Sequence, residues 1–115
     1  MCKARELEIY VGEPLDRPQN AGMGAGCQWF TRSDSGDVLI SVVAKRYYEP
    51  REGAADYREI AGIGERAWSA HELDGWAAGA VVGERAIYVS VAGRGASVQT
   101  AEALLREAVR RLPPG

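Results

Sequence analysis

Apolar residues near the C-terminal end of the chain recur every three to four positions, which is the spacing of one face of an α-helix. The repeat begins after Ser97 and comprises Val98, Ala101, Leu104, Leu105, Ala108, Val109 and Leu112. Ser97 is a suitable N-cap, and Pro113 and Pro114 cannot continue a helix. The pattern therefore predicts a long amphipathic helix that packs one face on the rest of the molecule.

The middle of the chain follows the shorter repeat of β-strands. We expect strands at residues 27–32, 38–46, 76–82 and 86–92, and a further one after the turn at residues 62–68. The segment 33–37 is a turn signal that joins the first two strands in a hairpin. Short turns join the last three in an antiparallel meander. Strand 38–46 is apolar on both faces at its centre, as expected for a strand covered on both sides.

The remaining segments complete the predicted fold. Residues 3–11 read as a short helix that Gly12 ends, and residues 12–26 are rich in proline and glycine and read as a loop. Residues 47–55 form a polar connection, and residues 54–60 are expected to form one or two helical turns. The prediction is one α+β domain over residues 1–115, with a five-stranded antiparallel sheet in the order α-β-β-α-β-β-β-α.

Composition and charge narrow the classes of function. The 115 residues are 46% apolar and 26% charged, and the net charge of −2 comes from acids and bases mixed along the chain. This distribution gives no electrostatic footprint for nucleic acid. The apolar stretches are too short to span a bilayer.

Two cysteines, Cys2 and Cys27, suggest a disulfide and therefore an oxidising compartment. The bridge would close a loop of roughly 26 residues and add about 3.5 kcal/mol of stability. Two alternatives stay open, namely two reduced cysteines in a cytosolic protein and a lipidated Cys2. No signal peptide precedes Cys2, so export would require a signal upstream of this sequence.

Candidate chemistry is sparse. His71 is the only histidine, so any Ser/His/Asp or Cys/His machinery would use it, together with Glu72, Asp74 or a remote carboxylate. A solvated or packing histidine is the simpler interpretation, and the ligand spacing of a zinc site is absent. The glycine-rich segment 22–26 lacks the strand before it and the helix after it that a dinucleotide site needs.

Two segments offer weaker binding features. Arg94, in the turn at residues 93–97, precedes the long helix and would let the helix N-terminus hold an anion. Tyr47 and Tyr48 lie beside basic residues, including Arg51, and could form an exposed binding surface. Adjacent residues of an extended segment point to opposite faces, so at most one of the two tyrosines is expected in the core. We place the candidate site in a groove between the sheet and the loops at residues 12–26 and 47–55.

Several short motifs resemble those of a protein family in their order and spacing. They are Cys2, the Gly-Glu-Pro-Leu of residues 12–15, the Gly-Cys-Gln-Trp of residues 26–29, the segment 57–68 and the helix at residues 101–108. Together they resemble small actinobacterial secreted lipoproteins of unknown function, which are similar to kinase extracellular sensor domains and to the Mog1/PsbP-like fold. The resemblance implies an exported domain with a Cys2–Cys27 bridge and no catalytic residues.

The sequence therefore predicts a non-enzymatic, extracytoplasmic domain that binds a small ligand or a partner at the cell envelope. It predicts no cofactor, metal or nucleic acid, and membrane contact only through a lipid anchor outside this chain. Two alternatives remain: a cytosolic interaction or dimerisation module, and a small enzyme that uses His71.

Overall fold

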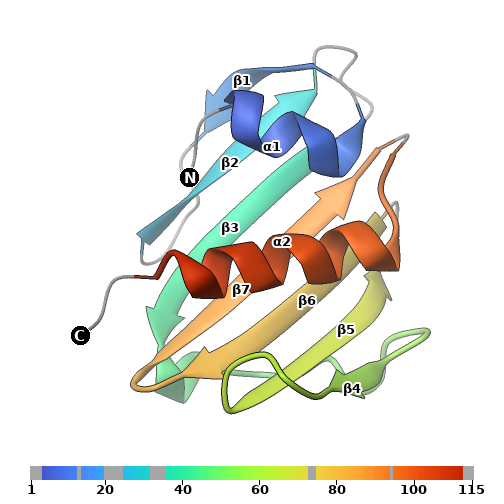
Figure 1. Cartoon of the computed structure of the whole chain (residues 1–115). Coiled ribbons are helices and arrows are strands. Elements are labelled where there is room, and N and C mark those ends of the chain that lie inside the picture. The colour runs from blue at the N-terminus through green and yellow to red at the C-terminus, as the bar shows by residue number, and fades with distance from the viewer. Residues whose placement is uncertain are drawn as a thin grey trace.

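The computed structural model describes residues 4–12, 14–19, 25–31, 36–72, 75–93 and 95–112. Its elements follow one another along the chain as α1 (Ala4–Val11), β1 (Leu15–Gln19), β2 (Ala25–Thr31), β3 (Asp37–Ala44), the 3-10 turn η1 (Lys45–Tyr47), β4 (Arg58–Ile60), β5 (Arg66–Glu72), β6 (Gly75–Val82), β7 (Arg85–Ala92) and α2 (Val98–Arg110). The fold is α+β, with the short helix α1 before the strands and the longer helix α2 after them (Figure 1).

The strands form one antiparallel sheet in the order β1-β2-β3-β7-β6-β5-β4. The predicted hairpin is confirmed, since β2 pairs with β3, and so is the meander of β5, β6 and β7. The first hairpin joins the meander through β3 and β7, which pair over eight residues each. Segments about 50 residues apart in the sequence thus form the centre of the sheet.

The prediction of five strands is wrong, because the sheet has seven. Part of the predicted loop at residues 12–26 is β1, and the predicted helical turns at residues 54–60 are replaced by turns followed by β4. Both additional strands lie at sheet edges and are short. Pro18 in β1 is tolerated there because an edge strand has one side without a ladder partner. Asp56 has a φ of +55°, which is incompatible with a continuous helix through residues 54–60.

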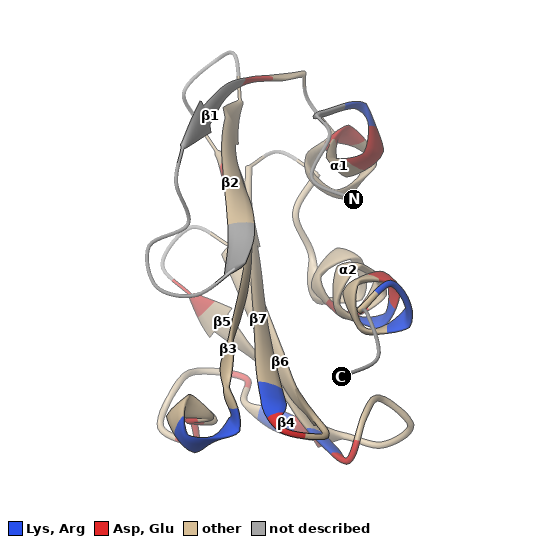
Figure 2. Cartoon of the chain, turned by 90° about the vertical axis from the view of Figure 1, so that its left-hand side faces the viewer, with Lys and Arg blue, Asp and Glu red and all other residues tan. Residues whose placement is uncertain are grey.

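Both helices lie on one side of the sheet (Figure 2). The buried face of α2 carries Leu104 and Leu105, which pack with Ile87 and Val89 of β7 in the main core. Leu7 and Val11 of α1 belong to the same core. The predicted N-cap is confirmed, since the Ser97 side chain accepts a hydrogen bond from the Thr100 amide. In return the Thr100 hydroxyl oxygen accepts from the Ser97 amide, which completes a capping box. Gly12, with a φ of +71°, ends α1 as predicted.

The second side of the sheet has a smaller core, covered by the chain between β3 and β4. We call residues 45–57 the crossover segment. Tyr48, Ala54 and Tyr57 of this segment pack against the buried Trp68 and against Tyr88. Strand β3 itself ends at Ala44 rather than Arg46, and on this side its Leu39 and Val43 are only half-buried. On the helix side Val38 and Ile40 are buried, so this face of the strand is covered more fully than the other.

Candidate functional site

A pocket of about 450 Å³ lies where the crossover segment meets one end of the sheet. Arg51 and Ala54 come from the crossover segment, and the sheet contributes Asp37, His71, Glu72, Gly75, Ser90, Val91 and Ala92. This volume falls in the range of small-molecule sites in proteins. The sheet thus forms one side of the pocket, and the crossover segment forms the other.

Strand register explains why these residues meet. Asp37 pairs with Ala92, Ala92 pairs with Gly75, and Gly75 pairs with Glu72. Because directly paired residues point to the same side of a sheet, the four form one row across β3, β7, β6 and β5. The two inner positions carry a methyl group and a hydrogen atom, so the row is low in the middle and has a carboxylate at each end. Ser90 lies one row further in.

The charges of the pocket are unevenly paired. Arg51 forms an ion pair with Glu72, whose side chain is 28% exposed. Asp37 accepts a hydrogen bond from the Gln28 amide, with 3.0 Å between Nε2 and Oδ2. Within the described part of the chain no cation pairs with Asp37. Among the described residues, the pocket therefore contains one ion-paired carboxylate, Glu72, and one without a cation partner, Asp37.

His71 is next to Glu72 in the sequence but points the other way. Consecutive residues of a strand alternate between the two faces of the sheet, so the imidazole lies on the helix side. There it meets Trp76 edge-on, with 4.9 Å between ring centres. Among the described residues no carboxylate hydrogen-bonds the imidazole. In the described part of the chain His71 therefore lacks the carboxylate contact that orients the histidine of a catalytic triad.

A second hollow, of about 620 Å³, lies on the crossover segment and is lined by Tyr47, Tyr88 and residues 49–53. Here the Tyr88 hydroxyl donates to the Tyr47 carbonyl oxygen at 2.7 Å and accepts from the Glu49 amide. Burial raises the pKa of Tyr88 above its usual value of 10, so the hydroxyl keeps its proton at neutral pH. Tyr88 thereby fastens the start of the crossover segment to β7.

The predicted binding residues have different environments. Tyr47 is 48% exposed and lines the second hollow. Tyr48 instead packs in the smaller core, where its ring centre lies 6.5 Å from that of Tyr88. The prediction that at most one of the two tyrosines is core agrees with this, although Tyr47 belongs to a 3-10 turn rather than an extended segment. Arg51 lines both hollows. Arg94 lies outside the described residues, and the binding roles of all four stay predictions.

Of the two cysteines of the predicted disulfide, only Cys27 belongs to the described residues. Cys27 lies on β2, half-buried against the main core, and no cysteine in the described part of the chain is a free thiol. Cys2 lies outside the described residues, so the Cys2–Cys27 pairing stays a prediction. Of the predicted groove, the described residues of the segment 12–26 belong largely to β1 and line neither of the two hollows, whereas the part at residues 47–55 corresponds to the crossover segment.

Asp37 and Ser90 were missed as pocket residues by sequence reasoning. Asp37 reads as the end of a turn, and Ser90 as the polar position of an alternating strand. Only the pairing of β3 with β7 brings them together, and no local pattern encodes that pairing. Glu72 drew attention solely as a sequence neighbour of His71.

The described residues contain no group of three or more histidine, cysteine or acidic side chains placed to hold a metal ion. None of their helices has the length and apolar character needed to cross a membrane. Comparison of the chain with family models, curated proteins and solved structures finds no match.

Proposed function

We propose that this chain is a non-enzymatic ligand-binding domain whose ligand site is the pocket between the crossover segment and the ends of β5, β6 and β7. The observation that carries the proposal is the row from Asp37 to Glu72, which combines charged ends with a low, small-residue centre. Sites for small molecules commonly join an apolar floor to a few polar groups in this way.

The setting of the pocket supports binding rather than catalysis. Its described polar groups are the Asp37 carboxylate, which is hydrogen-bonded to Gln28, the Arg51–Glu72 ion pair and the Ser90 hydroxyl. The imidazole of His71 faces the opposite side of the sheet. A serine without an adjacent base is a weak nucleophile. These groups are suited to holding a ligand, and they favour binding over the alternative of a small enzyme.

The alternative of a dimerisation module is less well supported by the sheet edges. Strand β4 spans only three residues, and β1 contains Pro18 and a change of register between Leu15 and Arg17. Short edges, proline and bulges all discourage pairing with a second chain. We therefore favour a domain that acts through its pocket.

We further propose that the domain works outside the cytoplasm, at the cell envelope. The support is the cysteine pair of the sequence and the resemblance to secreted lipoproteins. The ligand would then be a molecule of the envelope or its surroundings.

A fragment screen tests the proposed site directly. Amide resonances of isotopically labelled protein should shift in the lining residues Arg51, Ala54, Glu72, Gly75, Ser90, Val91 and Ala92 when a fragment binds. Ala92→Leu places extra methyl groups on the pocket floor and should abolish these shifts. Ala55→Leu is the matched control, because Ala55 is exposed and does not line the pocket. Fragments that bind only elsewhere, or equally well to both variants, would refute the proposed site.

A further inference from the structure

We infer that the ligand of this pocket is a small organic cation, a protonated amine with an apolar body, held with its charge against Asp37. The inference rests on the proposed function and specifies the chemistry that the site selects. It begins from the charges of the described lining residues.

Among the described lining residues, negative charges exceed positive charges by one. Asp37 and Glu72 are opposed by the single guanidinium of Arg51, and this guanidinium is committed to Glu72. The hydrogen bond from Gln28 occupies only one oxygen of Asp37 and brings no charge. Asp37 is half-buried and has no cation partner among the described residues, which favours a cationic ligand over a neutral or anionic one.

Distance keeps Arg51 from opposing such a ligand. The row from Asp37 to Glu72 crosses three strand spacings, which is roughly 14 Å between the main chains at its ends. Because Arg51 is paired with Glu72, its charge lies at the far end of the row. An ammonium group at Asp37 would thus meet the carboxylate well before it met the guanidinium.

The floor between the two ends defines the rest of the ligand. Ala92 and the buried Gly75 lie in the row, with Ala54 beside them, whereas the side chain of Val91 points to the main core on the helix side. Ala92, Gly75 and Ala54 offer aliphatic surface and almost no hydrogen bonding by side chains. The ligand body that fits them is apolar and short.

Three compounds of similar shape and different charge test the inference. Phenethylamine is cationic, phenethyl alcohol is neutral and hydrocinnamate is anionic at neutral pH. Titrations monitored by amide shifts of the pocket residues should rank the amine at least about tenfold tighter than the other two, as expected for a charge-assisted hydrogen bond. Added salt should weaken binding of the amine and leave binding of the alcohol unchanged.

Asp37→Asn removes the charge and keeps an acceptor oxygen for Gln28, so the variant should fold. It should weaken amine binding about tenfold. Asp56→Asn is the matched control: it makes the same change of net charge at an exposed position outside the pocket, where Asn tolerates the φ of +55°. This control should bind the amine as the unmodified protein does.

The outcomes separate the two proposals. Equal binding of the three compounds, tighter binding of the anion, or equal losses in both variants would overturn the cation assignment and leave the pocket as a binding site. Failure of phenethylamine to shift the pocket residues at millimolar concentration would overturn it too. The proposed function fails separately, when no fragment of any charge binds there.

Discussion

At the scale of single residues, Gly79 shows how one absent side chain shapes the smaller core. A Cβ atom built at this position would lie 2.5 Å from the Trp68 indole nitrogen. Trp68 is fully buried and lies over Gly79 because the two residues are paired across β5 and β6. Tyr57 and Tyr88 flank the same ring, each at 6.3 Å between ring centres. The glycine therefore makes room for the central aromatic ring of this core.

We expect Gly79→Ala to destabilise the protein by about 1–3 kcal/mol, because an overpacked core forces neighbours away from their preferred positions. Urea denaturation followed by circular dichroism measures the change. Gly53→Ala is the control, since nothing lies within 4 Å of its added Cβ atom and its φ is not positive. Equal stability of the two variants would contradict this account of the aromatic core.

At the scale of elements, the crossover segment owes its position to a few contacts with the sheet. Tyr88 bonds both the Tyr47 carbonyl and the Glu49 amide, and the His71 amide donates to the Ala55 carbonyl at 2.8 Å. The ion pair of Arg51 with Glu72 lies between these two attachments. The walls of the proposed site thus depend on contacts between segments far apart in the sequence.

Removal of the Tyr88 hydroxyl tests this dependence. Tyr88→Phe should cost about 1 kcal/mol of stability, the usual value of a lost hydrogen bond, and should speed amide hydrogen exchange in residues 45–57. Tyr10→Phe is a suitable control, since no hydrogen bond of the Tyr10 hydroxyl is present in the described part of the chain. Unchanged exchange in the crossover segment would mean that Tyr88 does not fasten it.

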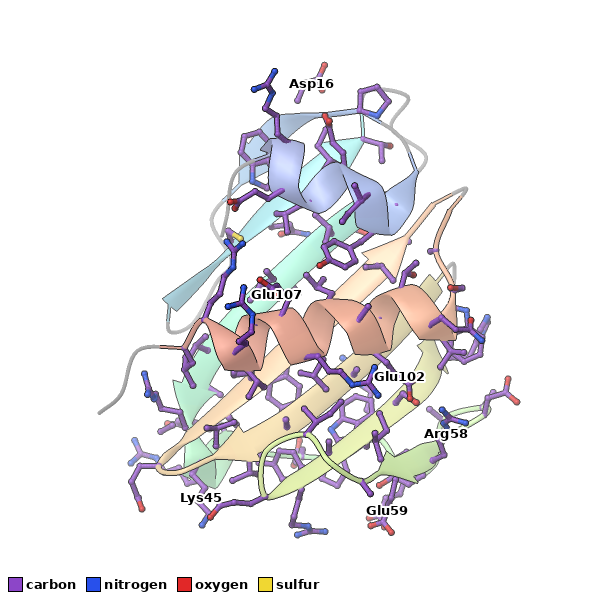
Figure 3. The ribbon with its side chains drawn as sticks, viewed as in Figure 1. Asp16, Lys45, Arg58, Glu59, Glu102 and Glu107 are labelled. Carbon is purple, nitrogen blue, oxygen red and sulfur yellow. The ribbon has the colours of Figure 1, made fainter. Side chains whose placement is uncertain are left out.

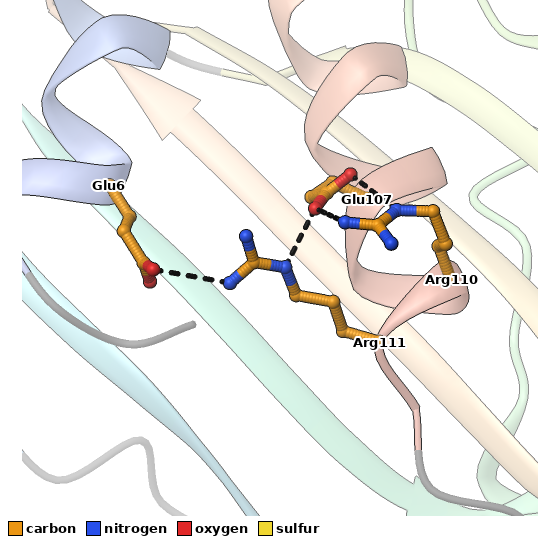
Figure 4. A network of polar contacts seen from close by, with 4 residues as sticks. All are labelled: Glu6, Glu107, Arg110 and Arg111. Carbon is orange, nitrogen blue, oxygen red and sulfur yellow. Dashed lines mark hydrogen bonds and ion pairs between the residues drawn. The ribbon is translucent and has the colours of Figure 1, made fainter.

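The two helices are joined by a chain of charges (Figure 4). Arg111 lies 3.2 Å from Glu6 of α1 and 2.6 Å from Glu107 of α2, and Arg110 also pairs with Glu107. Hydrogen bonds from Arg110 and then Arg111 lower the pKa of Glu107 from 4.5 to about 2. The Glu6 pKa is lowered as well, chiefly by its hydrogen bond to Arg111.

These shifts predict a loss of stability in acid. Because the Glu107 pKa is lower in the folded state, the unfolded chain binds more protons between about pH 4.5 and pH 2, and stability falls as the pH falls through that window. Glu107→Gln should flatten the fall of the urea midpoint across the window. Glu52→Gln, at an exposed residue without an ion pair in the described part, should leave the slope unchanged. Identical slopes in both variants would contradict the prediction.

A second charged contact anchors the edge of the sheet to α2. Arg58 of β4 lies 2.8 Å from Glu102, whose side chain is only 9% exposed (Figure 3). Burial of a carboxylate on α2 is tolerated because this partner reaches it from the edge strand. The shortest strand of the sheet thereby gains a contact outside its own ladder.

At the scale of the whole molecule, the predicted Cys2–Cys27 bridge would tie the start of the chain to β2. On protein made in an oxidising compartment, the intact mass should be about two daltons below the reduced value, and reduction should remove the deficit. Reduction should also lower the free energy of unfolding by about 3.5 kcal/mol. Two readily alkylated thiols in the native protein would refute the bridge and weaken the extracytoplasmic proposal.

The sequence predicted the elements whose pattern is long and local. The α2 stripe from Val98 onwards and the alternation of Ile87, Val89 and Val91 both identify their elements, because many positions repeat with one period. The prediction of helical turns at residues 54–60 is wrong, because pairing of Arg58–Ile60 with β5 makes the end of this segment a strand. Of the proposed site, the sequence predicted only Arg51 and a groove at residues 47–55.

Local patterns are enough to predict α1, α2, the hairpin, the meander and the α+β class, because hydrogen bonds within a helix or across a short turn join near neighbours in the chain. Assembly of the sheet fixes the seven-stranded order, the path of the crossover segment and the row from Asp37 to Glu72. Those features depend on pairing between strands far apart in the chain, such as β3 with β7. The energy of such pairing comes from surfaces that exist only once the sheet has assembled, so no local stretch of residues records it.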